Sequence, residues 1–309
     1  MQYVGLQQQI RRNNFRSVLL LLAFPLVMLA MVYAFLWIAA TAQNGHPNVI
    51  NNFTTTVPLV IAGTVIWFTV AWFFHSKMIR KATGSRPLER MENKRVYNLV
   101  ENLCISGGMK IPKIFVIEDS SLNAFASGIS EDTYAISLSR GIIDKLEDRE
   151  LEAVIAHEMT HISNRDVRLL IISVIFVGIF AFISEMALRS IQYRGWSRNG
   201  KNNEAIMLVA LVITTVAYLI SLLLRFGISR SREYMADAGA AELTRNPHAL
   251  ASALRKISND PWIEAIQSRD IAQMFIDNPK PGTGRLSRGT LFATHPPIGK
   301  RIALLEQYM

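Results

Sequence analysis

Four long runs without a charged residue decide what kind of fold this chain can adopt. They cover residues 18–40, 57–74, 169–184 and 205–224 of the 309. A helix needs roughly twenty apolar residues to cross a bilayer core, so the first, second and fourth runs are long enough and the third is marginal. The positive mean hydropathy of +0.22 agrees with a chain that is partly immersed in lipid. We therefore expect a membrane protein with about four transmembrane helices.

The basic residues predict how these helices are oriented. Three arginines precede the first run, the loop 41–56 has no Lys or Arg, and five basic residues lie between 77 and 90. By the positive-inside rule, the N-terminus and the chain from residue 76 onward face the cytoplasm. The loop between the third and fourth runs is also basic, which is unusual for an outer loop. A partly embedded hairpin is therefore the alternative to two full spans.

Composition excludes several other classes of protein. The net charge of +9 follows mostly from this topology. The sequence shows no basic face with recognition elements, so we expect no nucleic-acid partner. A single cysteine, Cys104, excludes an internal disulfide. The first run is longer than the apolar core of a cleaved signal peptide, so we expect it to stay as an anchor.

The polar part of the chain between the runs predicts a mixture of helices and strands. Helical periodicity over 90–105 ends at Gly107-Gly108, and a helix is expected over 144–162 with Asp148 as its N-cap. Three short strands are expected between these helices, in KIFVIEDS (113–120), NAFASG (123–128) and TYAISLS (133–139).

One stretch, AVIAHEMTHISNRD at 153–166, has the spacing of a metal site. His157 and His161 are four residues apart and lie on one face of a helix. Glu158 is about 100° round the helix, close enough to reach a water molecule held there. In the pattern H-E-x-x-H two histidines hold zinc and the glutamate is the general base. The stretch predicts a catalytic zinc site if the chain supplies a third ligand.

The third ligand is expected after the fourth apolar run. The extended pattern with a glycine and a third histidine fails, because the chain has Asn164 and Val167 at those positions. Residues 229–243, SRSREYMADAGAAEL, are expected to form a helix on which Glu233 and Asp237 share a face. Glu233 would bind the metal, and Asp237 would accept the other N–H of a ligand histidine. The alternative is an exposed helix with solvated acids.

Taken together, these segments resemble the membrane-embedded zinc peptidases of the HtpX/Ste24 group, family M48. The resemblance rests on AVIAHEMTHISNRD, on SRSREYMADAGAAELT (229–244) and on FATHPPIGKRI (292–302), and SLNAFASG (121–128) matches a further segment. It covers nearly the whole chain, including the four apolar runs in order, and the short N-terminal hairpin is closer to the bacterial branch.

The resemblance implies a mostly α-helical membrane protein with about four transmembrane helices. Its cytoplasmic, zincin-like α+β metalloprotease domain would be assembled from two chain segments. The expected parts are an N-terminal transmembrane hairpin (1–75), a first protease segment with the motif helix (76–166), a second membrane hairpin (167–226) and a second protease segment with the third ligand (227–309).

The resemblance also implies a role for each site residue. One Zn²⁺ per chain would be bound by His157, His161 and Glu233, with Glu158 as the base and Asp237 behind a ligand histidine. The substrate backbone would pair with Asn123 and Ala124, and the oxyanion would be stabilised by His295 and Arg301. The alternatives are a turn role for Asn123, a cap before Pro296-Pro297 for His295 and a surface charge for Arg301.

The implied activity is that of a zinc metalloendopeptidase in the cytoplasmic (inner) membrane. It would cut membrane or misfolded proteins on the cytoplasmic side, as in membrane protein quality control and the stress response. One alternative is a prenyl-protein (CAAX-type) endopeptidase, which shares the chemistry. Another is a non-catalytic zinc-stabilised membrane scaffold, which Glu158 argues against because a structural zinc site needs no base. The loop 272–289 is expected to gate the cleft, and the sequence predicts no oligomeric state.

Overall fold

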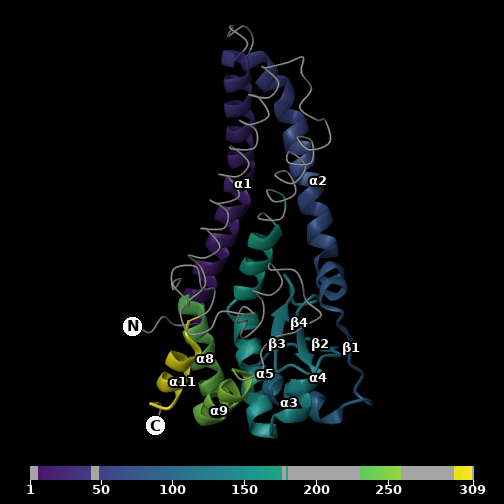
Figure 1. Cartoon of the computed structure of the whole chain (residues 1–309), viewed down its shortest axis with the longest axis vertical. Coiled ribbons are helices and arrows are strands. Elements are labelled where there is room, and N and C mark those ends of the chain that lie inside the picture. The colour runs from purple at the N-terminus through teal and green to yellow at the C-terminus, as the bar shows by residue number, and fades with distance from the viewer. Residues whose placement is uncertain (1–5, 43–48, 176–178, 180–229, 259–295, 308–309) are drawn as a thin grey trace, which may run out of the picture. The chain divides into compact units, whose positions relative to one another are not determined.

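The structure is a computed structural model that describes residues 6–42, 49–175, 179, 230–258 and 296–307 (Figure 1). The chain forms two compact units. One contains residues 1–14, 74–171 and 226–309, and the other contains residues 15–73 and 172–225. Most of the predicted second membrane hairpin lies outside the described residues, as does the loop 272–289. The four-span topology and the predicted domain boundaries therefore stay predictions.

The second unit contains most of two long helices, α1 (Leu6–Ala42) and α2 (Val49–Thr83). Within the described part of the chain, these are the helices long and apolar enough to cross a membrane, over Ile10–Trp37 and Val49–Thr83. Phe24 of α1 and Ile172 of the third run are buried in one apolar cluster, to which Trp67 of α2 also packs. Other large apolar side chains point outward, Leu59 at 74% exposure among them, as expected for contact with lipid. The first two runs are thus helical, as predicted.

A four-stranded sheet forms one side of the first unit (Figure 1). Its strands are β1 (Arg86–Pro87), β2 (Lys113–Ile117), β3 (Ala124–Ser127) and β4 (Ala135–Ser139), in the order β1-β2-β4-β3. Strands β2 and β4 are parallel, and β3 runs antiparallel to β4 at the edge of the sheet. The three strands predicted from the sequence are confirmed, with β1 as an additional short strand.

Helix α3 (Lys94–Gly107) confirms the predicted periodic segment, although it begins four residues later than expected. It begins there because the Asn93 side chain accepts a hydrogen bond from the N–H of Val96. It ends at Gly108, whose φ of 62° is the left-handed conformation that favours glycine.

The helix predicted over 144–162 is in fact two helices, α4 (Arg140–Lys145) and α5 (Asp148–Ser163). Leu146 between them has an extended backbone and a buried side chain. The Arg95 guanidinium donates to the carbonyls of Ile143 and Leu146, which satisfies the end of α4. The N-cap of α5 is Glu147, so the prediction of Asp148 was wrong by one residue.

The motif helix α5 lies between the sheet and the C-terminal helices (Figure 1). It packs against β3 and β4 on one side and against α8 (Arg230–Thr244) and α9 (Pro247–Ile257) on the other, with α11 (Ile298–Leu305) packed on α8 and α9. Buried Glu150 of α5 accepts hydrogen bonds from Ser252 and Lys256 of α9, both at 2.7 Å. The predicted helix over 229–243 is confirmed as α8.

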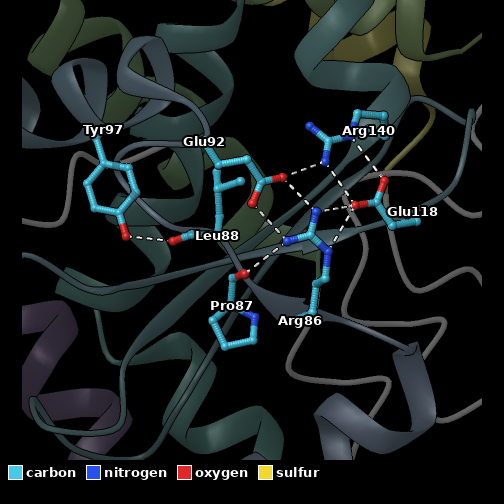
Figure 2. A network of polar contacts seen from close by, with 7 residues as sticks. All are labelled: Arg86, Pro87, Leu88, Glu92, Tyr97, Glu118 and Arg140. Carbon is cyan, nitrogen blue, oxygen red and sulfur yellow. Dashed lines mark hydrogen bonds and ion pairs between the residues drawn. The ribbon is translucent and has the colours of Figure 1, made fainter.

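Figure 2 shows a network of charges that ties the edge of the sheet to the start of α4. Arg86 of β1 donates to Glu92 and Glu118, and Arg140 of α4 donates to the same two carboxylates. These hydrogen bonds lower the pKa of Glu92 to about 2. The network lies at the surface, so it orients the loop before α3 more than it stabilises the fold.

Candidate metal centre

Helix α5 places the two motif histidines one above the other. Their rings are 4.8 Å apart and perpendicular, and the Nε2 atoms of His157 and His161 are separated by 3.2 Å. His157 and Glu158 are buried within the fold, whereas the side chain of His161 is 14% exposed. The helix therefore presents two imidazole nitrogens to one point, as the i, i+4 spacing predicted.

Helix α8 brings the carboxylate of Glu233 to the same point. Its Oε2 is 3.8 Å from Nε2 of His157, and its Oε1 is 3.6 Å from Nε2 of His161. Ligands bound tetrahedrally to zinc at 2.0–2.1 Å lie about 3.3 Å from one another. The two imidazole nitrogens are 3.2 Å apart, and each lies within 3.8 Å of one of the two Glu233 oxygens, so the donor set and its spacing fit a zinc ion.

A carboxylate lies behind each histidine. Nδ1 of His157 is 3.0 Å from Oδ1 of Asp237, and Nδ1 of His161 is 3.1 Å from Oδ2 of Asp166. A carboxylate that accepts the Nδ1 proton leaves the lone pair of the imidazole on Nε2, where a metal would bind. Asp237 was predicted for this position. Asp166 was missed, because five residues beyond His161 an ideal helix would point it about 140° away.

Arg301 of α11 lies behind the site and is almost completely buried, at 1% exposure. Its guanidinium donates to both carboxylate oxygens of Asp237 at 2.8 and 2.7 Å, and its Nη1 is 3.4 Å from Oε2 of Glu233. The alternative that Arg301 is a surface charge is therefore wrong. Such a two-bonded pair fixes the carboxylate in position as well as balancing its charge.

Comparison with known proteins identifies a family for this chain. The family model described as Peptidase family M48 matches residues 90–309. The chain belongs to this family. A protease HtpX homolog of Bacteroides fragilis is 56% identical over the full length of both chains, and one of Lactobacillus helveticus is 35% identical over 98% of this chain and 99% of its own. The crystal structure of S. mikatae Ste24p aligns with a TM-score of 0.44 at 20% identity, covering 93% of this chain and 66% of that one.

Membership of family M48 makes the chain a metallopeptidase, and its two long apolar helices make it a membrane metallopeptidase. Within the described part of the chain, His157, His161 and Glu233 form a group of side chains that could hold a metal ion, with all three ligand atoms within 4.8 Å of one another. The metal that the family implies therefore fits these three side chains.

Burial shifts the pKa values of the M48 site. Desolvation raises the pKa of Glu158, against the opposing effect of His157 and His161. Burial alone would lower the pKa of His161, but its hydrogen bond to Asp166 and the charge of Glu233 raise it to about 9. A proton and a metal ion thus compete for the same imidazole.

The remaining predicted residues differ in what the structure shows of them. Asn123 is buried just before the edge strand β3, where its N–H donates to Ser139 Oγ at 3.0 Å and its Oδ1 accepts from the N–H of Ala124 at 2.9 Å. The N–H of Ala126, in the same strand, makes a hydrogen bond to the Glu158 carboxylate. The edge strand and the base are thus adjacent. His295 lies outside the described residues.

A close approach of two helices sets the width of the site. A Cβ atom on Gly239 of α8 would lie 2.5 Å from Cγ2 of Thr160 of α5, whose hydroxyl donates to the carbonyl of Ala156. Thr160 lies between the motif residues, so the absence of a side chain at Gly239 lets Glu233 reach the histidines.

We expect Gly239→Ala to weaken metal binding. Overpacking costs about 1–3 kcal/mol, which exceeds the gain of about 1 kcal/mol in helix propensity, and α8 must move away from α5. Metal affinity and melting temperature measure both effects, with Gly299→Ala as the control because its Cβ would meet no atom of the described residues within 4 Å. Thr160→Ala should restore affinity to Gly239→Ala. Unchanged affinity in Gly239→Ala would contradict the close-approach argument.

Proposed function

We propose that this chain is a zinc-dependent endopeptidase of the cytoplasmic membrane that cleaves membrane or misfolded proteins on the cytoplasmic side. The observation that carries the proposal is the triangle of His157, His161 and Glu233 with Glu158 buried beside it. Two imidazoles and one carboxylate leave a fourth position open for water or substrate, which is the arrangement of catalytic zinc sites. A zinc-stabilised scaffold has no use for the carboxylic acid at position 158.

The chemistry divides between the metal and the residues of the chain. Zinc, when bound, supplies Lewis acidity that polarises the scissile carbonyl and acidifies a water molecule. Glu158 accepts a proton from the attacking water, whose oxygen bonds to the carbonyl carbon. When the C–N bond breaks, Glu158 returns that proton to the amine nitrogen. Burial raises the pKa of Glu158 toward the working pH, which suits a group that must both accept and return a proton.

Residues around the base position the reactants. Strand β3 is the last strand of the sheet in the part of the chain that the structure describes, and an extended substrate added beside it would lie next to Glu158. An extended segment bound through its backbone favours cleavage within a chain. The oxyanion roles of His295 and Arg301 stay predictions. The two hydrogen bonds of Arg301 to Asp237 support a positioning role for this residue.

The proposed cytoplasmic side rests on charge and on connectivity. Residues 1–14, 74–171 and 226–309 belong to the same compact unit as the site. These are the segments that carry Arg11, Arg12, Lys77, Arg80 and Lys81, and basic residues flank spans on the cytoplasmic side. The lipid bilayer is thus a partner, nucleic acid is not, and quality control of membrane proteins is the process that fits such a location.

Metal removal and restoration test this function. In detergent, we expect the purified chain to cut casein, to lose this activity with a chelator and to regain it at about one Zn²⁺ per chain. Mass spectrometry of the products should show internal cuts. Chelator-resistant cleavage, or trimming from the ends alone, would contradict the proposal. Faster cutting of a prenylated peptide than of its unprenylated twin would favour the prenyl-protein alternative.

A further inference from the structure

The turn after α5 is an unusual piece of backbone next to the metal centre. Arg165 has a φ of 59°, a left-handed conformation that is uncommon for a residue with a side chain. The N–H of Arg165 donates to the carbonyl of Ile162 at 3.0 Å, which closes the turn. Such strain persists where the surrounding structure holds it in place. The left-handed turn directs the side chain of Asp166 back to Nδ1 of His161.

Asp166 joins three segments that are far apart in the sequence. Its Oδ2 is 3.1 Å from Nδ1 of His161, and its Oδ1 accepts a hydrogen bond of 2.7 Å from the amide of Asn13, in α1. Its backbone carbonyl accepts from Arg232, next to the ligand Glu233 in α8. Asp166 is 2% exposed. An aspartate at a helix start commonly caps the next turn, but here the two carboxylate oxygens bind Asn13 and His161.

Asn13 is fully buried, at 0% exposure, and its amide group can bind in one orientation. Its Nδ2 donates to the carbonyl of Asn164 at 2.9 Å as well as to Asp166, so both N–H groups are used. Both partners are acceptors, so the amide oxygen cannot take the place of the nitrogen. Asn13 thus holds the Asp166 carboxylate by Oδ1, while His161 contacts its other oxygen, Oδ2.

We infer that Asn13 and Asp166 are positioning residues for the metal site, and that the N-terminal segment of the chain holds the ligand His161 in its metal-binding orientation through them. This inference rests on the proposed metal site. Carboxylates behind a ligand histidine fix its tautomer and orientation, and their loss typically costs about 10–100-fold in metal affinity. Asn13 acts on the histidine indirectly, because its hydrogen bond is to the Asp166 carboxylate that contacts His161.

Metal affinity of the full chain tests the inference without using activity. All variants carry Glu158→Gln to prevent self-cleavage, and Zn²⁺ and Co²⁺ binding are measured in detergent well below the melting temperature of the metal-free protein. We expect Asp166→Ala to weaken binding by about 10–100-fold. Asn13→Asp has almost the same shape but places a carboxylate against two acceptors. It should weaken binding by about tenfold and change the Co²⁺ absorption spectrum.

Asn14→Asp is the matched control, because it adds the same charge one residue further along α1. Asn14 contacts Arg165 through its Oδ1, a contact that the carboxylate preserves. We expect its metal affinity to stay within about twofold of the parent. In the Asp166→Ala background, Asn13→Ala should have no further effect on metal affinity, since the route proposed from Asn13 to His161 runs through the Asp166 carboxylate.

Three outcomes would overturn the inference. They are equal affinities for Asn13→Asp and Asn14→Asp, additive effects of Asn13→Ala and Asp166→Ala, and a lowered melting temperature with an unchanged Co²⁺ spectrum. The last would mean that Asn13 serves stability alone. If the parent chain itself binds no metal, the proposed function fails. If the parent binds and the variants match it, the inference alone fails.

Discussion

Glu233→Gln should abolish metal binding at submicromolar free zinc and, with it, peptidase activity. Its amide has almost the same shape as the carboxylate but lacks the charge and the strong donor oxygen that zinc prefers. The carboxylate oxygens of Glu233 lie 3.6 and 3.8 Å from the imidazole nitrogens, within reach of a metal ion that both histidines bind. Structural zinc sites bind the metal with a free energy of about 10–16 kcal/mol, and two histidines alone should bind it several orders of magnitude less tightly.

Glu242→Gln is the control for this change, since Glu242 is an exposed acid in the same helix. It should bind one zinc per chain with unchanged affinity. Metal content after gel filtration and competition with a chromophoric chelator give the two measurements. Zinc bound by Glu233→Gln as tightly as by the wild type would show that the third ligand is another residue.

Arg301→Gln should lower the melting temperature of the metal-free chain by about 10 °C. Removing one partner of a buried ion pair leaves the other charge uncompensated, at a cost of about 3–5 kcal/mol, and each kcal/mol moves the melting temperature of a large domain by about 2–4 °C. Here the charge left behind is that of Asp237, whose pKa burial would raise but the Arg301 guanidinium lowers. Metal affinity should fall too, because Asp237 loses the group that orients it behind His157.

Arg255→Gln supplies the comparison. Arg255 forms an exposed ion pair with Glu306, just after α11, and such pairs contribute about 1 kcal/mol or less. Adding Asp237→Asn to Arg301→Gln should recover part of the lost stability, since the uncompensated charge is then absent. Equal melting temperatures for Arg301→Gln and Arg255→Gln would rule out an anchoring role for Arg301.

The local part of the site was predictable from the sequence. His157, Glu158 and His161 lie within five residues of one helix, so helical geometry alone places them together. Glu233 and Asp237 were predicted because an i, i+4 pair on a helix with small residues suits a metal site facing another helix. The structure brings these residues together as expected, from α5 and α8.

Other features depend on contacts that a sequence pattern does not show. Asp166 reaches His161 because the backbone turns at Arg165 in a left-handed conformation. Glycine or asparagine would have indicated such a turn, but the residue at that position is an arginine. The burial of Arg301 depends on Asp237, 64 residues earlier in the chain. The break between α4 and α5 has no proline or glycine. It follows from the burial of Leu146 and from the binding of its carbonyl by Arg95.

Cleavage of casein by the wild-type chain and by Glu158→Gln, measured side by side with the zinc content of both, tests the central claim most directly. Loss of a general base typically costs about 10²–10⁴-fold in rate, and Glu158 is not among the three metal ligands. We therefore predict that both proteins hold one zinc per chain and that the wild type alone cuts at a measurable rate. Equal cleavage by both proteins, or a wild type that holds its zinc and cuts nothing, would contradict the account.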